Sequence, residues 1–182
     1  PQRRSAIIGH ELARYGIDIA ALSETRVHGD RQFEEVGSGY TFFLTGYPAD
    51  GPSQAGVGFA IRTSLIPRLR SMPTGHSPRL MSLQLELVGG FAATIISAYA
   101  PTLVAAEEEK DRFHDQLDSL VRLVPHRNKL ILLGDFNARV GRDHGAWESV
   151  IGNHGVGNEN SNGTRLLSFC SMHRLSITNT LF

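Results

Sequence analysis

The sequence is poor in cysteine, because Cys170 is the only one among 182 residues. A single cysteine cannot form an internal disulfide, which excludes a secreted domain stabilised by disulfides. Long apolar runs are missing as well: none approaches the roughly 18 residues that a transmembrane helix needs, and the first residues do not form a signal peptide. We therefore expect a soluble, intracellular protein.

Net charge is also absent, since 18 Lys and Arg residues balance 18 Asp and Glu residues. A strongly basic domain would indicate a nucleic-acid partner, and this balance gives no such indication. Hydrophobic residues make up 41% of the chain, as in ordinary globular proteins, which excludes intrinsic disorder, collagen and a coiled coil. The length predicts a single domain.

Helical and strand patterns are interspersed along the chain. Apolar residues at three- and four-residue spacings predict helices over residues 3–15, 104–124 and 163–173. Apolar or alternating runs predict strands over residues 17–22, 40–44, 56–62, 81–87, 91–99, 130–133 and 175–178. We expect Gly89 and Gly90 to form a two-residue hairpin turn and 130–133 to be buried on both faces. A hairpin excludes a purely parallel sheet, so the fold class is α/β with mixed sheets covered by helices.

Three polar clusters follow apolar strands at the point where each strand ends: residues 23–26, 97–101 and 134–138. Each alone is typical of a solvated turn. Together they offer Glu24 as an oxygen ligand for Mg²⁺ and Asp135 as a group that orients and deprotonates water. Asn137 would position a phosphate oxygen and the Tyr99 phenol would stabilise one. This combination indicates metal-assisted phosphodiester hydrolysis.

These motifs resemble a known family. Leu22-Ser-Glu-Thr-Arg26, Ile96-Ser-Ala-Tyr-Ala-Pro101 and Leu132-Leu-Gly-Asp-Phe-Asn-Ala138, in this order, are similar to the endonuclease/exonuclease/phosphatase superfamily. More narrowly, the chain resembles endonuclease domains of LINE-type (non-LTR) retrotransposons and their host-encoded relatives, the craniofacial development protein 2-like proteins. The resemblance implies a four-layered α/β sandwich, with two mixed β-sheets face to face and helices outside, and Mg²⁺-dependent nicking of DNA.

The resemblance also implies a role for each motif residue. Glu24 would be the ligand of Mg²⁺, or of Mn²⁺ in its place. Tyr99 would be the phenol on the phosphate side, Asp135 the carboxylate that activates water, and Asn137 its positioning partner. The expected reaction is in-line attack of water on a phosphodiester.

Three further residues are candidates for the site. Asn162, in Asn160-Ser-Asn-Gly163, matches a family asparagine that lines the catalytic cleft. Arg26 and Arg139, each two residues after a candidate catalytic group, either contact DNA phosphates or lie in exposed loops without a role. The expected partner is DNA and not a membrane, for a monomeric protein of the nucleus. A reverse transcriptase domain would belong to the same polypeptide if the chain is part of a retroelement.

The chain also departs from the family pattern, which begins with an Asn on a strand before the first helix and closes with an Asp-His pair. The asparagine has no counterpart here, because the sequence starts at the expected helix. Asp143-His144 does not match the closing pair, because it follows Asn137 by only six residues inside a loop. We therefore expect residues 1–182 to be one incomplete domain, truncated at both ends. It would be inactive on its own, because losing a charge-stabilising donor costs orders of magnitude in rate.

Two alternatives remain open from the sequence. The first is a phosphomonoesterase of the same fold acting on inositol phosphates, or a sphingomyelinase, because such enzymes share the Glu and Gly-Asp-x-Asn motifs. The second is a binding protein that retains the fold without catalysis.

Overall fold

The computed structural model describes residues 4–51 and 54–182. The chain divides into two compact units, each of which is described by itself. The first comprises Pro1–Tyr99 and Val124–Gly134, and the second comprises Ala100–Leu123 and Asp135–Phe182.

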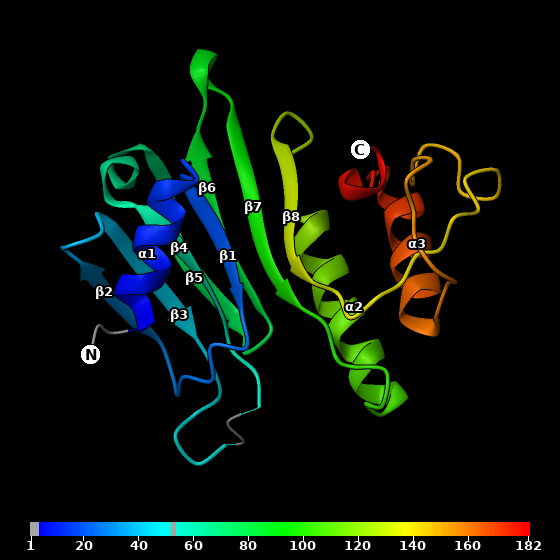
Figure 1. Ribbon diagram of the computed structural model, residues 1–182, viewed down its shortest axis with the longest axis horizontal. Helices are drawn as coiled ribbons and strands as arrows, with labels where there is room; N and C mark the ends of the chain where they lie inside the picture. Colours follow the sequence, from blue (N-terminus) through cyan, green and yellow to red (C-terminus); the bar gives the residue numbers. More distant parts are fainter. Residues whose placement is uncertain (1–3, 52–53) are drawn as a thin grey trace. The chain divides into compact units, whose positions relative to one another are not determined.

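The first unit contains two four-stranded sheets (Figure 1). One sheet has the order β1 (Ile19–Ser23), β4 (Val57–Arg62), β3 (Tyr40–Thr45), β2 (Arg31–Glu35). The other has the order β5 (Leu69–Ser77), β6 (Leu80–Glu86), β7 (Ala92–Tyr99), β8 (Lys129–Asp135). All three pairings of the first sheet are antiparallel. The second sheet is mixed, because β5, β6 and β7 are antiparallel while β8 runs in the same direction as β7 (Figure 1).

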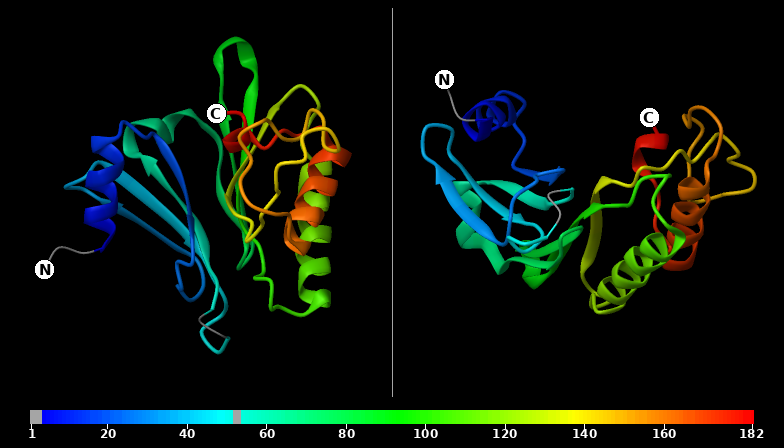
Figure 2. Two further views of the ribbon diagram at one scale, coloured as in Figure 1. Left: turned by 45° about the vertical axis from the view of Figure 1, so that its right-hand side comes forward. Right: turned by 90° about the horizontal axis from the view of Figure 1, so that it is seen from below.

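The core of this unit lies between the two sheets. Phe43 and Phe59 of the first sheet share one buried cluster with Leu83 and Ile95 of the second, which is the face-to-face arrangement of a sandwich. Helix α1 (Arg4–Arg14) covers the outer face of the first sheet (Figure 2), where Leu12 packs in a second cluster. The expected α/β sandwich is confirmed, although the first sheet is antiparallel rather than mixed. Strands β2, β3 and β4 follow one another along the chain and pair as antiparallel neighbours, and β1 adds to β4 at the edge.

Helix α1 ends as the sequence predicts. Gly16 has φ +66°, and its N–H donates to Ala13 O at 3.1 Å while the Ile17 N–H donates to Leu12 O at 2.9 Å. This is the Schellman pattern that a C-terminal glycine permits. Residue 3, where we expected the helix to begin, lies outside the described residues.

The second unit contains α2 (Glu107–Arg122), α3 (Ser161–His173) and the 3₁₀ turn η3 (Thr178–Thr180). Arg165 of α3 joins the two helices through ion pairs with Glu107 at 2.7 Å and Asp111 at 2.6 Å of α2. Val150, Ile151, Leu166, Leu167 and Cys170 form its buried cluster. Among the described residues, no helix is long and apolar enough to cross a membrane.

Several local expectations were wrong. Residues 175–178 form no strand, because this segment has one ladder-like bond, from Ile177 N to Val150 O at 2.7 Å, and then turns into η3. The hairpin has a three-residue loop, η2 (Val88–Gly90), closed by a bond from Leu87 N to Phe91 O at 2.9 Å. Strand β8 is not buried on both faces: it lies at a sheet edge, and Ile131 is 42% exposed.

The sequence patterns also missed two strands and the six-residue turn η1 (Thr63–Arg68). Strand β2 reads Arg-Gln-Phe-Glu-Glu and offers one apolar residue. Strand β5 contains Pro73, and register shifts interrupt its pairing with β6. Both are edge strands, where proline and charge are tolerated.

Candidate active site

Glu24 and Tyr99 come together at the ends of two strands in different sheets. Glu24 follows β1 directly, and Tyr99 is the last residue of β7. The Tyr99 hydroxyl donates to Glu24 Oε1 at 3.0 Å. Tyr99 is only 5% exposed, whereas the Glu24 side chain is 52% exposed. A buried phenol thus orients a carboxylate that remains open to solvent.

The backbone around Glu24 adopts an unusual conformation. Glu24 and Arg26 have φ values of 53° and 51°, a region that non-glycine residues visit at a cost. Two ladder-like bonds hold the segment: Thr25 N donates to Gly56 O at 3.1 Å and Arg26 N to Ala55 O at 3.0 Å. A Cβ at Gly56 would overlap Thr25 Oγ1 and lie 2.9 Å from Arg26 N. Gly56 is therefore required for the approach of the Glu24 segment, a requirement that the sequence analysis missed.

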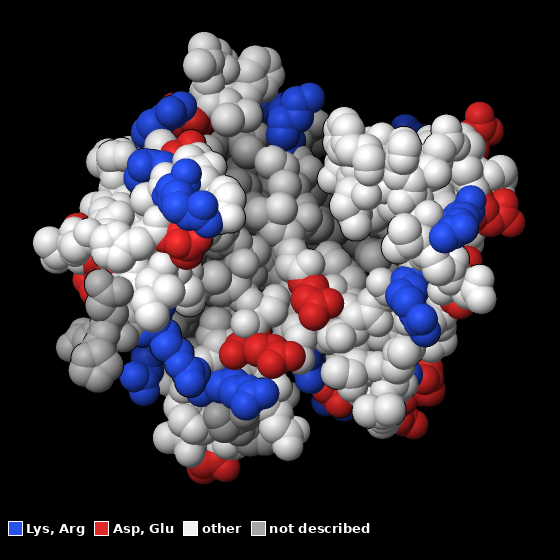
Figure 3. Space-filling view, viewed as in Figure 1, with Lys and Arg blue, Asp and Glu red and all other residues white. Residues whose placement is uncertain are grey.

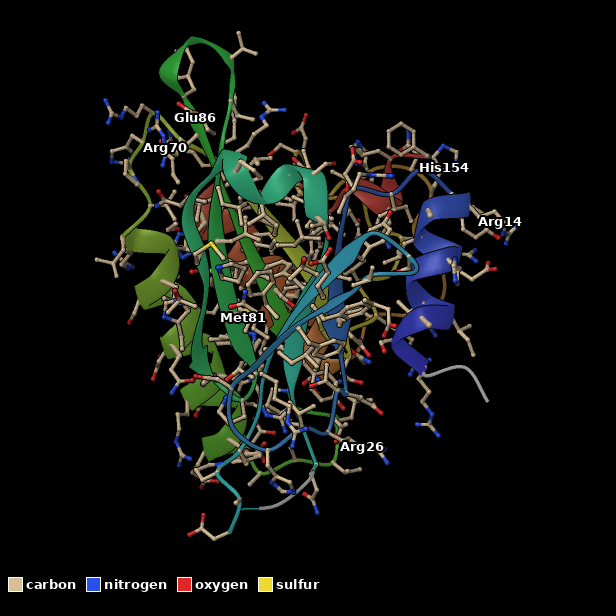
Figure 4. All side chains as sticks on the ribbon, turned by 90° about the vertical axis from the view of Figure 1, so that its left-hand side faces the viewer. Arg14, Arg26, Arg70, Met81, Glu86 and His154 are labelled. Carbon is tan, nitrogen blue, oxygen red and sulfur yellow. The ribbon has the colours of Figure 1, made fainter. Side chains whose placement is uncertain are left out.

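Arg26 extends from this same loop (Figure 4), and its Nη2 lies 3.4 Å from Glu24 Oε2. Its side chain is 67% exposed. Exposed ion pairs contribute little free energy, so this pair by itself adds little to the stability of the loop.

The second unit holds the other predicted residues. Asp135 is the last residue of β8, and its Oδ1 accepts a hydrogen bond from the Asn137 N–H at 2.8 Å. The Asn137 side chain donates from Nδ2 to Ala100 O at 2.9 Å, and Ala100 N donates to Asp135 O at 2.9 Å. These bonds join the segment after β8 to the segment after β7, and they orient Asp135 and Asn137 together.

Asn162 strengthens the same connection from α3. It is 4% exposed, and its Nδ2 donates to Pro101 O at 3.0 Å and to Asn137 O at 3.1 Å. Asn160, the N-cap of α3, accepts hydrogen bonds at Oδ1 from Gly163 N and from Arg139 N. The Arg139 backbone is thus fixed while its side chain is exposed.

Asp143 and His144 have local roles in the loop, as expected. Asp143 Oδ1 accepts from Ala146 N at 3.0 Å, and His144 Nδ1 lies 2.7 Å from Ile151 O. Cys170 is buried in α3, and burial raises the pKa of its thiol to about 11. A thiol that stays protonated is a poor nucleophile, so Cys170 belongs to the core.

The residues present fit a Mg²⁺ site with few protein ligands. Within the described part of the chain, no three His, Cys, Asp or Glu side chains gather as a metal-binding group, so a closed cage of protein ligands is not formed there. Mg²⁺ is usually held by one or two carboxylates together with waters and substrate phosphates. The exposed carboxylate of Glu24, oriented by Tyr99, offers this kind of ligand.

The surface carries no continuous basic stripe on the face shown in Figure 3, where Lys and Arg side chains lie among Asp and Glu. This agrees with the balanced composition.

Comparison with known proteins agrees with these motifs. Residues 1–173 match the sequence profile of the Endonuclease/Exonuclease/phosphatase family. Craniofacial development protein 2 of Bos taurus is 32% identical over 179 residues, and that of Tragulus javanicus is 31% identical over the same length. Each alignment covers 97% of this chain but only 28% and 29% of the relatives, so the chain spans less than a third of their length. The profile match over nearly the whole chain shows that it belongs to the endonuclease/exonuclease/phosphatase family.

Proposed function

We propose that this chain hydrolyses phosphodiester bonds in DNA with the help of Mg²⁺, or of Mn²⁺ in its place. Members of the family are hydrolases and generally depend on a divalent metal. The observation that carries the proposal is the hydrogen bond from the buried Tyr99 hydroxyl to the half-exposed Glu24 carboxylate. Glu24 would hold the metal. When bound, a Mg²⁺ ion polarises the phosphate and neutralises charge that develops on it.

Asp135 supplies the base in this proposal. Its Oδ1 is occupied by the Asn137 N–H, which leaves Oδ2 to accept the proton of an attacking water. Asn137 Nδ2 uses one proton for Ala100 O, and an amide nitrogen has a second proton to donate. That proton would position a phosphate oxygen. Because backbone bonds fix both side chains beforehand, little reorganisation is needed when charge develops.

Two arginines support a DNA backbone as the substrate. Arg26 and Arg139 are exposed and follow the candidate catalytic groups by two residues each. Guanidinium groups suit bidentate contacts with phosphate. Contacts of this kind position a duplex without reading its sequence. With DNA as the substrate, we place the protein in the nucleus as a monomer, together with a reverse transcriptase domain if it is part of a retroelement.

The test is a single-turnover nicking assay in which the chain is in excess over supercoiled plasmid, so that slow hydrolysis is detected. Because no counterpart of the family's closing Asp-His pair was found in the sequence, the expected rate is lower by orders of magnitude, and ordinary turnover assays should show no activity. Under single-turnover conditions we expect slow formation of nicked circles with Mg²⁺ but not with EDTA, and none with Asp135→Asn. The matched control is Asp143→Asn, which removes a loop carboxylate with a local role and should nick like the unmodified chain.

Three results would contradict the proposal. The first is no nicking at all, as for a binding protein that only retains the fold. The second is nicking that Asp135→Asn leaves unchanged. The third is hydrolysis of an inositol phosphate or sphingomyelin while the plasmid stays intact.

A further inference from the structure

Arg79 contacts Tyr99 at both its ring and its backbone. Arg79 lies in the turn between β5 and β6, and its guanidinium carbon is 5.1 Å from the centroid of the Tyr99 ring. Its Nη1 donates to Tyr99 O at 3.2 Å, and Tyr99 N donates to Arg79 O at 2.9 Å. A guanidinium over an aromatic face is attracted by the ring's quadrupole. Together these contacts restrict the rotation of the Tyr99 ring.

The same turn also supports the loop that carries Glu24. Pro78 O accepts a hydrogen bond from Gly56 N at 3.0 Å, and Gly56 O accepts one from Thr25 N at 3.1 Å. A short series of backbone bonds therefore runs from the turn to the residue next to Glu24. The turn at residues 78–79 thus fixes both partners of the Glu24–Tyr99 hydrogen bond.

We propose that Arg79 is a positioning residue for the metal ligand and acts through Tyr99. This inference rests on the proposed function, because it assigns Arg79 to the Glu24 site. With its ring held by Arg79, the Tyr99 hydroxyl stays directed at Glu24 Oε1. The metal would then take Oε2, in place of the exposed Arg26 guanidinium that lies 3.4 Å from it. Groups that orient a metal ligand in this way influence affinity without touching the ion.

Arg79 differs from the two other arginines that matter for the comparison. Arg26 is exposed and contacts Glu24 itself. Arg70 lies beside Glu86, far from Arg26 in Figure 4, and its Nη2 donates to Gly90 O at 2.9 Å near the hairpin loop. Arg79 is partly buried, and it contacts Tyr99, whose hydroxyl in turn donates to Glu24. Arg70→Met is therefore the matched control for Arg79→Met.

The experiment is a double-mutant cycle with the Mn²⁺ dissociation constant as the readout. Tyr99→Phe should weaken Mn²⁺ binding by about tenfold, the lower end of effects at residues that orient a ligand. Arg79→Met should weaken it by up to the same factor, and the double variant should bind no worse than Tyr99→Phe alone, because residues that act through one contact are not additive. Arg79→Lys retains the charge and should recover part of the affinity. Arg70→Met should have no effect.

Two results would overturn the role of Arg79. One is an Mn²⁺ affinity that Arg79→Met does not change. The other is full additivity with Tyr99→Phe, which would show that Arg79 acts independently of Tyr99.

A second measurement keeps this inference separable from the proposed function. If the unmodified chain binds no Mn²⁺, the proposed function fails, and ¹⁹F NMR of the chain labelled with fluorotyrosine then decides about Arg79. The resonance missing in Tyr99→Phe identifies Tyr99. It should shift in Arg79→Met and stay in place in Arg70→Met. An unshifted resonance in Arg79→Met overturns the inference whether or not metal binds.

Discussion

Replacing Gly134 by alanine should displace the strand that carries Asp135. Gly134 has φ +140° and lies against β7, so an added Cβ would overlap Ala98 O and lie 2.8 Å from Ala98 C and 3.0 Å from Ala98 N. All three are backbone atoms, so no side-chain rotation relieves the overlap. Either β8 separates from β7 or the backbone at Gly134 changes, and Asp135 is the next residue in both cases.

The expected loss of stability follows from two contributions. A non-glycine residue in such a backbone region costs about 1–3 kcal/mol, and overpacking against a fixed backbone costs about 1–3 kcal/mol more. Gly134→Ala should therefore reduce the free energy of unfolding by about 2–6 kcal/mol, measured by urea denaturation with circular dichroism.

The matched control for this prediction is Gly90→Ala. Gly90 also has a positive φ, of 78°, but a Cβ there would meet nothing within 4 Å. Its cost is the left-handed conformation alone, about 1–2 kcal/mol. Equal losses for the two variants would refute the argument that close approach of β7 requires Gly134.

Three further predictions concern the second unit. Asn162→Leu leaves the carbonyls of Pro101 and Asn137 without its two hydrogen bonds, so the free energy of unfolding should fall by at least about 2 kcal/mol; an unchanged urea midpoint would contradict this. Burial lowers the pKa of His114 from 6.5, so the unfolded chain binds a proton that the folded chain does not. The free energy of unfolding should therefore fall as the pH drops below about 6.5, and it should fall less steeply in His114→Phe. Equal pH dependence of the free energy of unfolding in the two chains, measured by urea denaturation, would argue against this. Cys170, with a pKa of about 11, should react slowly with a thiol reagent in the folded chain, whereas rapid labelling would show that it is accessible.

The residues at the strand ends could be predicted from the sequence because their signals are local. An apolar run such as Leu130–Leu133 indicates a strand by itself, and the polar residues that follow must lie at its end. The same holds for Glu24 after β1 and for Tyr99 at the end of β7. Local periodicity therefore located each candidate group on an element.

The supporting contacts could not be predicted because they join residues far apart in the chain. Tyr99 bonds to Glu24 across 75 positions, and Asn162 reaches Pro101 across 61. Neither Arg79 nor Gly56 has a local signal for its role, since each acts against a segment brought near by folding. The spacing of apolar residues also gave no strand signal at β2, because this polar edge strand forms by pairing with its neighbour β3.

The most direct test of the account is the Mg²⁺ dependence of nicking by Glu24→Gln. Glutamine retains the size of the side chain but lacks the charge that a hard cation prefers. We predict that the Mg²⁺ concentration giving half-maximal nicking rises by at least about tenfold, since even groups that only orient a ligand change affinity by this much. Glu34→Gln, an exposed glutamate on the edge strand β2, should leave it unchanged. The same Mg²⁺ dependence in Glu24→Gln as in the unmodified chain would contradict the assignment of Glu24 as the metal ligand.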